Sequence, residues 1–413
     1  MNAHHELAGR YGTPLYVYDL DRVAEARRSL FAALPAGFEV FYAVKANPHP
    51  EVARALREGE GPSCRAEISS VGELAVAIEA GYAAGECLYT GPGKTDGELD
   101  IAIGAGVRLF SVESLTDMRR IGATADRHGA VAQCLLRINS QWVGAPTGIR
   151  MMGRPSQFGI DAETLPALMP HLTAVRGARV VGAHFFTMSN AADESSLLAE
   201  YEEVIELAAM LTDEIGLPLE LLDIGGGFAS PYAAPGERAT YDKLRIYLEP
   251  ILDLYLPRWR SGHPRLACES GRYLVGGSGS LTCGVVNIKE SRGNRYVILD
   301  AGINVIGGLS GLGRLMPMAV ELEGLAGHEV TDVANLVGPL CTPGDLLGRG
   351  VTVPPLEIGD LITVPNVGAY GVSASLVSFL GRPAPAEVTV RGGDVVSVSR
   401  LAYQRGFEPV SGS

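Results

Sequence analysis

The chain lacks several features that mark particular classes of protein. Its 413 residues contain no uninterrupted apolar run of about 18 residues, so we expect no helix that spans a bilayer. The polar start, Met1 to Arg10, has no apolar stretch of the signal-peptide kind. Only 6 cysteines occur, scattered and without a CxxC pair. This argues against a disulfide framework or a metal site and favours reduced thiols in a cytoplasmic protein.

Basic residues are also in deficit. The 34 Lys and Arg residues face 47 Asp and Glu residues, for a net charge of −13. Nucleic acids and anionic membranes bind clustered basic surface, so we expect neither as a partner. With 46% hydrophobic residues the chain can bury a full core, and its length suits two domains or a large barrel with an addition.

Two sequence patterns divide the chain. In the first, from about residue 38 to 265, short apolar strand candidates alternate with helical stretches such as 71–80 and 200–215. Such alternation predicts parallel β/α units, and their number suggests a (β/α)8 barrel over residues 25–265. The strand candidates are 38–44, 86–91, 107–112, 132–139, 179–186 and 219–226.

After Cys268 the pattern changes: strand candidates are joined by Gly and Pro turns, without long helices. This predicts an all-β domain over residues 266–413, of the β-sandwich or β-barrel-like kind. The early strand candidate PLYVYDL, residues 14–20, precedes the barrel pattern, so we assign residues 1–24 to the β domain as well.

Lys45 closes the apolar segment 38–44, which would place it at the mouth of the barrel, where active sites form. Burying an ammonium is costly unless the group is paired or used chemically. One interpretation is a lysine that emerges into solvent. The other is a Schiff-base lysine, whose desolvation makes the neutral, nucleophilic amine available.

Other segments carry similar alternatives. The run GGGF, residues 225–228, is either a turn or a place where backbone N–H groups approach a phosphate. Glu269 and Arg272, in CESGR, are either a plain ion pair or the partners of a pyridine nitrogen and a phosphate. Cys341 and Tyr370 stand in Gly- and Pro-bounded turns, and singly each is more often a core residue.

Together, six segments in order along nearly the whole chain resemble the group III pyridoxal-phosphate decarboxylases of the alanine-racemase-like fold. The segments are FYAVKAN, GAHFF, GGGF, ESGR, GPLC and GAY. The best-known members of that family act on ornithine and meso-diaminopimelate. The resemblance implies a barrel plus a β domain, pyridoxal 5′-phosphate as cofactor, and a homodimer with shared active sites.

The resemblance also implies a role for each matching residue. Lys45 would attach the cofactor covalently, and Cys341, which the partner subunit supplies in this family, would protonate Cα after carbon dioxide leaves. Glu269 would face the pyridine nitrogen, where racemases of this fold have an arginine, so the acid favours decarboxylation. The other implied cofactor-binding residues are His184 or Phe186, Arg137 and Glu67 around the ring, and Ser189, Gly226, Gly227, Arg272 and Tyr370 around the phosphate.

The sequence departs from the family pattern at informative positions. Thr342 follows Cys341, where familiar members carry an acid for the distal ammonium of a diamino substrate. Glycines including Gly308 replace the Arg-Pro-x-Leu-Tyr segment of diaminopimelate enzymes. Since a buried charge without a partner is costly, a free diamino acid fits poorly. Phe186 and Met188 also occupy the usual His and Gly positions of the HxGS pattern.

The strings GPLCTPGDLLG, GAYGVSASLVSFLGRPAPAEV and MMGRPSQFGID are similar to a subset that acts on amino acids tethered to acyl carrier proteins in natural-product assembly. Glutamyl- and methylaspartyl-carrier-protein decarboxylases are examples. A side-chain carboxyl masked as a thioester needs no charged pocket, and a Gly-lined channel could admit a phosphopantetheine arm. Arg150 and Arg154 are either contacts for an acidic carrier protein or solvated loop residues.

The leading hypothesis is therefore a decarboxylase of an aspartyl or glutamyl group tethered to a carrier protein. The alternative is a decarboxylase of a free or ligated amino acid, of the diaminopimelate, ornithine or siderophore-precursor type. A homologue that binds the cofactor without catalysis would be expected to lack Lys45 or Cys341, and both are present.

Overall fold

The computed structural model describes residues 3–140, 149–150, 155–191, 193–307, 320, 322 and 332–406. The chain forms two compact units. The barrel unit comprises Arg22–Ser230 and Glu237–Gly277. The β unit comprises Met1–Asp21, Pro231–Gly236 and Ser278–Ser413.

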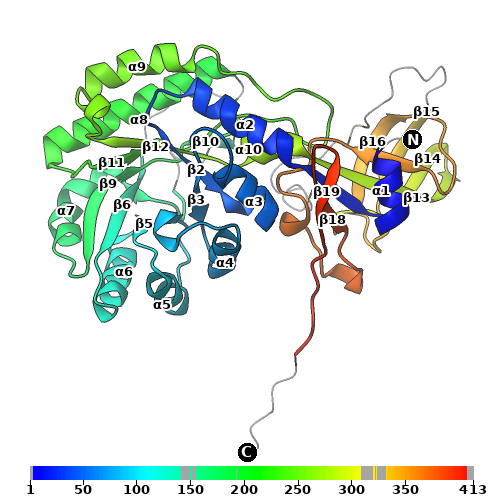
Figure 1. Cartoon of the computed structure of the whole chain (residues 1–413), viewed down its shortest axis with the longest axis horizontal. Helices are drawn as coiled ribbons and strands as arrows, with labels where there is room; N and C mark the ends of the chain where they lie inside the picture. Colours follow the sequence, from blue (N-terminus) through cyan, green and yellow to red (C-terminus); the bar gives the residue numbers. More distant parts are fainter. Residues whose placement is uncertain are drawn as a thin grey trace, which may run out of the picture. The chain divides into compact units, whose positions relative to one another are not determined.

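The barrel unit is built on a closed ring of parallel strands (Figure 1). Neighbours in the ring follow the order β5-β4-β3-β2-β12-β11-β9-β6, and pairing of β5 with β6 closes it. The short strand β8 (Ile160–Asp161) extends β6. The ring strands are β2 (Glu39–Ala43), β3 (Arg65–Ile68), β4 (Cys87–Tyr89), β5 (Leu109–Val112), β6 (Ala132–Asn139), β9 (Ala178–His184), β11 (Leu221–Asp223) and β12 (Arg265–Ser270).

Helices follow most of these strands and cover the outside of the ring (Figure 1). Their ends carry local signals: Thr95 and Glu98 form a capping box at the start of α5, and Gly216 ends α8 in the left-handed conformation. The helices are α2 (Leu20–Ala33), α3 (Pro50–Arg57), α4 (Val71–Glu79), α5 (Asp96–Ala105), α6 (Leu115–Arg127), α7 (Leu165–Thr173), α8 (Glu194–Ile215), α9 (Leu244–Tyr255) and α10 (Arg272–Val275).

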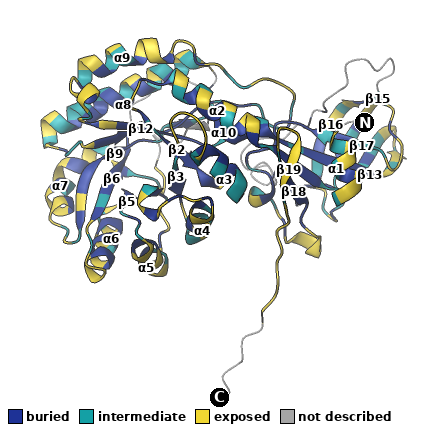
Figure 2. Ribbon diagram, in the orientation of Figure 1, coloured by how far each residue is buried: buried dark blue, intermediate teal, exposed yellow. Residues whose placement is uncertain are grey.

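The barrel interior is filled by side chains, as Figure 2 shows by the buried colour of its strands. One cluster takes a side chain from each of seven ring strands, and its members are at most 4% exposed. This packed core carries the strand ends, so the residues that follow them are held rigidly. The cluster consists of Phe41, Leu88, Leu109, Leu135, Val181, Leu221 and Ala267.

The β unit contains a mixed sheet in the order β16-β15-β14-β13-β1-β18-β19, with β17 paired to β13, and the helix α1 (Ala3–Tyr11). The N-terminal strand β1 (Leu15–Asp19) runs antiparallel to β13 and parallel to β18. The other strands are β13 (Gly279–Ser291), β14 (Asn294–Leu299), β15 (Asp332–Val337), β16 (Leu346–Val353), β17 (Leu361–Val364), β18 (Ala386–Arg391) and β19 (Asp394–Ser399).

The fold predicted from the sequence, a (β/α)8 barrel with a β domain that includes the N-terminal strand, is confirmed. The bounds of the units differ from those expected. The barrel unit continues past residue 265 to Gly277, because β12 pairs with β2 and β11. In the described part of the chain, every helix is too short or too polar to cross a membrane.

Candidate active site

Lys45 lies just beyond β2, in the single turn Val44–Ala46. Its Nζ is 3.3 Å from both carboxylate oxygens of Glu67, which stands on the neighbouring strand β3. Glu67 is buried, and the Thr90 hydroxyl donates to it from the end of β4. The lysine side chain is 41% exposed. The ammonium is therefore oriented by a buried carboxylate while remaining accessible at the mouth of the barrel.

Phe186 follows β9 and lies near two cations. Its ring centroid is 5.7 Å from Lys45 Nζ and 5.8 Å from Cζ of Arg137, which stands on β6. Arg137 also lies 4.7 Å from the Phe158 ring and donates to Glu113 at 3.1 Å. An aromatic ring so placed beside Lys45 is suited to cover the face of a planar ligand.

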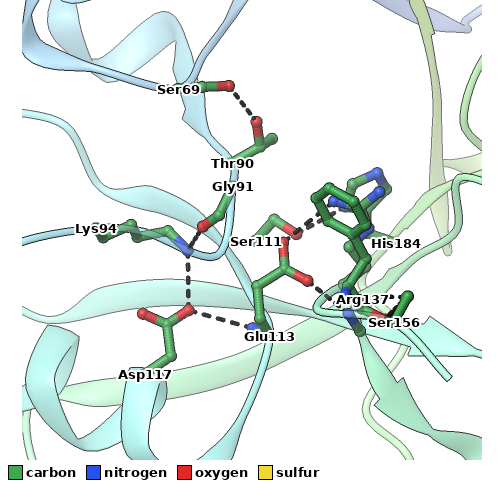
Figure 3. Close-up of polar contacts among 12 residues, drawn as sticks. Ser69, Thr90, Gly91, Lys94, Ser111, Glu113, Asp117, Arg137, Ser156 and His184 are labelled. Atoms are coloured by element: carbon green, nitrogen blue, oxygen red, sulfur yellow. Dashed lines mark hydrogen bonds and ion pairs between the residues drawn. The ribbon is translucent and has the colours of Figure 1, made fainter. Parts of the chain in front are cut away.

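The carboxylate of Glu113 holds the Arg137 side chain in place, and its neighbours hold Glu113 in turn (Figure 3). The Glu113 carboxylate also accepts from Gly159 N at 2.6 Å, and its own backbone N–H donates to Asp117 at 3.2 Å. Asp117 is paired at 2.8 Å with Lys94, whose side chain is completely buried and also donates to the Gly91 carbonyl. This buried ion pair connects the loop after β4 with α6, so Arg137 rests on a rigid support.

The glycine run after β11 passes close to Glu269 and Phe186. A Cβ on Gly226 would lie 2.8 Å from the Glu269 carbonyl oxygen and 3.5 Å from the Phe186 ring. Gly227 has φ of +114°, which side-chain-bearing residues rarely adopt. Only glycine fits both positions, and the run therefore brings bare backbone next to the ring and carboxylate.

Beneath these groups lies a buried polar cluster. His184, at the end of β9, has Nε2 3.2 Å from Oε1 of Glu269 on β12, and its Nδ1 is 2.7 Å from the Ser111 hydroxyl on β5. Asp223, at the end of β11, also joins: one nitrogen or oxygen atom from each of His184, Asp223 and Glu269 lies within 4.8 Å of the others. The side chains of the Glu269 and His184 pair are 3% and 1% exposed.

The pKa values of this cluster reflect burial and mutual charge. Burial alone would lower the pKa of His184, but the Glu269 carboxylate, with a smaller contribution from Asp223, holds that pKa above its ordinary value. Burial would likewise raise the pKa of Glu269, but His184, followed by Lys45 and Arg137, leaves it lowered. Burial, and then the charge of Glu269, raise the pKa of Asp223 to about 7. The cluster thus favours an imidazolium beside an ionised Glu269.

Arg272 and Ser189, both predicted phosphate contacts, also stand on the barrel unit. Arg272 is the first residue of α10, directly after the strand that carries Glu269. Ser189 lies in the short strand β10 (Met188–Ser189), which pairs with β7 (Ile149–Arg150). Their roles as phosphate contacts remain predictions.

Cys341 belongs to the β unit and is exposed, whereas the other five cysteines are buried. Asp345 holds its turn: one carboxylate oxygen accepts from Leu340 N at 2.7 Å and the other from Ile303 N at 2.8 Å. The Thr342 hydroxyl accepts from Gly344 N at 3.3 Å within the same turn. An accessible thiol is thus presented on a turn tied by a buried carboxylate to the segment after β14.

Tyr370, also on the β unit, has a left-handed backbone with φ of +54°. The hydroxyl of Tyr232 donates to its carbonyl at 3.1 Å. A non-glycine residue in this conformation is uncommon, and the contact from Tyr232 helps to hold it there. Of the remaining predicted residues, Arg154 and Gly308 lie outside the described residues, and only the backbone of Arg150 is described.

Comparisons with known proteins identify the family of the chain. Residues 20–276 match the model of the pyridoxal-dependent decarboxylase family, pyridoxal binding domain. The chain belongs to this family. It is an amino acid decarboxylase, and pyridoxal phosphate is its cofactor.

The chain is similar to relatives with two different activities. The chain is 31% identical to the L-glutamyl-[BtrI acyl-carrier protein] decarboxylase of Niallia circulans, over 95% of this chain and 92% of that protein. It is 34% identical to the diaminopimelate decarboxylase of Neisseria meningitidis serogroup B, over 95% and 92%. The crystal structure of Helicobacter pylori diaminopimelate decarboxylase with L-lysine matches with a TM-score of 0.82 at 25% identity, over 97% of each chain.

The decarboxylase's own residues fit pyridoxal phosphate. Lys45 offers an accessible amine at the barrel mouth, and Phe186 offers an aromatic face beside it. Oε1 of Glu269 is buried without a hydrogen bond of acceptable angle among the described residues, so it can accept one from a pyridinium N–H. The bare backbone at Gly226 and Gly227 lets a phosphate approach closely.

Sequence reasoning missed Ser111, Glu113 and Asp223 in the barrel unit and Asp345 in the β unit. Each barrel residue is polar and stands at the carboxyl end of an apolar strand, the same signal that singled out Lys45. That signal would have found them if it had been applied to every strand. Asp345 follows Cys341 within the GPLCTPGD segment, but its two backbone contacts depend on tertiary structure.

Proposed function

We propose that this decarboxylase removes the α-carboxylate of an acidic amino acid tethered as a thioester to an acyl carrier protein. The observation that carries the proposal is Thr342. It stands directly after Cys341, is uncharged, and uses its hydroxyl within its own turn. A distal ammonium would lack an acidic partner at this position, whereas a thioester needs none.

The similarity to the Niallia circulans enzyme supports this substrate class, because that enzyme acts on a glutamyl group on a carrier protein. The diaminopimelate decarboxylase of Neisseria meningitidis is equally similar to the chain. Decarboxylation of a free amino acid is therefore the second candidate function, and Thr342 argues against it for diamino acids.

In the proposed reaction each residue has a defined task. Lys45 would hold the cofactor covalently, Phe186 would cover the ring, and Glu269 would accept a hydrogen bond from the ring nitrogen. When bound, pyridoxal phosphate supplies an electron sink for the pair released from the Cα–carboxylate bond. As that bond breaks and carbon dioxide leaves, the Cys341 thiol would deliver a proton to Cα.

The remaining implied contacts belong to the same proposal. Ser189, Arg272 and Tyr370, with the glycine run, would surround the phosphate. The enzyme would act as a homodimer in which Cys341 comes from the partner subunit, and an acidic carrier protein would be its macromolecular partner.

The test is carbon dioxide release from a panel of substrates. Aspartate, glutamate, ornithine, lysine and diaminopimelate in solution are compared with aspartyl and glutamyl thioesters on phosphopantetheinylated carrier protein. We expect release from the tethered forms alone, and the preferred side-chain length will name the substrate. Release from a free diamino acid would contradict the proposal and support the second candidate.

A further inference from the structure

In the buried polar cluster, each ring nitrogen of His184 contacts a different side chain. If both nitrogens of His184 are protonated, Nδ1–H donates to the Ser111 hydroxyl at 2.7 Å and Nε2–H faces Oε1 of Glu269 at 3.2 Å. A neutral imidazole with its proton on Nε2 would also satisfy both contacts, because the Ser111 hydroxyl can donate to Nδ1. The Ser111 contact, shown in Figure 3, therefore orients the imidazole, and the argument for its charge rests on the buried Glu269 carboxylate 3.2 Å from Nε2.

The charges around His184 favour its imidazolium form. The groups that face His184 are Glu269 from β12, Asp223 from β11 and Arg137 from β6. Arg137 is itself paired with Glu113 at 3.1 Å, and burial raises the pKa of Asp223 to about 7. Below that pH, therefore, the imidazolium of His184 is left to balance the Glu269 carboxylate. A buried carboxylate without such a partner would tend to take up a proton.

The consequence concerns Glu269 in particular. Its Oε1 lies close to His184 but makes no hydrogen bond of acceptable angle, so the contact is electrostatic and the oxygen retains an open acceptor position. A carboxylate kept ionised by a cation behind it, and open in front, is suited to hold a protonated ring nitrogen.

We propose that His184 is a positioning residue that keeps Glu269 ionised and oriented, with Ser111 fixing the imidazole from its other side. This inference rests on the function proposed for Glu269. It assigns the covering of the cofactor ring to Phe186 and gives His184 a separate task beneath the site.

The test uses the full-length holoenzyme and two nitrogen-15 NMR measurements. The first follows the ring nitrogens of labelled histidine, with His184→Gln to assign the signal and His171→Gln, on the exposed end of α7, as the matched control. We expect both His184 nitrogens to be protonated at neutral pH. A neutral His184 in the wild-type protein would overturn the proposal. The decisive signal is that of the wild type, and the variant His184→Gln serves only to assign it.

The second measurement follows the pyridine nitrogen of labelled pyridoxal phosphate. We expect a protonated signal in the wild type and in His171→Gln, and its shift toward the unprotonated position in His184→Gln and Glu269→Gln. If Glu269→Gln moves the signal and His184→Gln does not, the inference about His184 is wrong while the function of Glu269 stands. If neither moves it, the function proposed for Glu269 fails as well.

Discussion

Lys45 and Cys341 are the two residues on which the proposed chemistry depends most directly, and losing each should have a different effect. Lys45→Ala removes the amine that binds the cofactor covalently, so the purified protein should lose the visible absorbance of that linkage and all turnover. The control is Lys289→Ala on exposed β13, which should keep both. A Lys45→Ala protein that retains the absorbance and turns over would contradict the assignment.

Cys341→Ala should keep the cofactor absorbance because the cysteine takes no part in cofactor attachment. Loss of a positioned proton donor should slow decarboxylation by about 10²–10⁴-fold or divert the proton toward C4′ of the cofactor. Rate and product identity are measured together. Unchanged rate and product would show that another group protonates Cα.

At the scale of elements, the buried pair of Lys94 and Asp117 connects the loop after β4 with α6. Lys94→Ala leaves the Asp117 carboxylate buried and without its cation, which should lower stability by about 3–5 kcal/mol. Denaturant unfolding of Lys94→Ala and of the double variant Lys94→Ala with Asp117→Ala measures this. The double variant should recover part of the loss, and a purely additive loss would contradict a coupled pair.

The start of α4 should give stability a pH dependence. Ser70 caps the helix, and the Glu73 carboxylate accepts from Ser69 N at 2.6 Å. Burial raises the pKa of Glu73 to about 7, above its value in the unfolded chain, so the folded state binds more protons. The stabilisation it gives is fully present below about pH 4.5, the ordinary pKa, and is lost progressively as pH rises to about 7, by up to about 3 kcal/mol in total.

Glu73→Gln keeps an oxygen acceptor for Ser69 N but cannot titrate. Its thermal midpoint should match the wild type below about pH 4.5, exceed it increasingly up to about pH 7, and keep that lead above pH 7. A difference between the two proteins that stays constant with pH would exclude Glu73 as the titrating group.

The elements themselves could be predicted from sequence to different degrees. The run 132–139 matches the bounds of β6, because its apolar residues are interrupted only by Gln133 and Arg137 and still give a strand signal. The strand β3, RAEI, is absent from the predicted set since four residues with two charges give no apolar signal. The sequence predicts too early an end for the barrel, because β12 is followed by only a short helix and its pairing with β2 and β11 depends on the fold.

The same contrast holds within the site. Lys45 and Glu269 could be singled out because a charged residue ends an apolar strand. The proximity of His184 to Glu269 could not, because these residues are far apart in the chain and meet only through the strand order β9-β11-β12. The capping of the Cys341 turn by Asp345 likewise depends on contact with Ile303.

At the scale of the whole molecule, the proposed sharing of sites between subunits can be tested by complementation. Lys45→Ala and Cys341→Ala proteins should each be inactive or slow, but mixed dimers would contain one site with both native residues. After unfolding and joint refolding, random pairing should restore about a quarter of the parent activity. Each variant refolded alone is the control, and no gain on mixing would show that Lys45 and Cys341 act from the same chain.

The central claim, decarboxylation of a carrier-tethered amino acid, is tested most directly by the intact mass of the carrier protein after incubation with the enzyme. We expect aspartyl- or glutamyl-loaded carrier to lose the mass of one carbon dioxide while the thioester remains intact, and the same carrier to stay unchanged with Lys45→Ala. Loaded carrier of unchanged mass, beside carbon dioxide released from a free amino acid by the same preparation, would contradict the account.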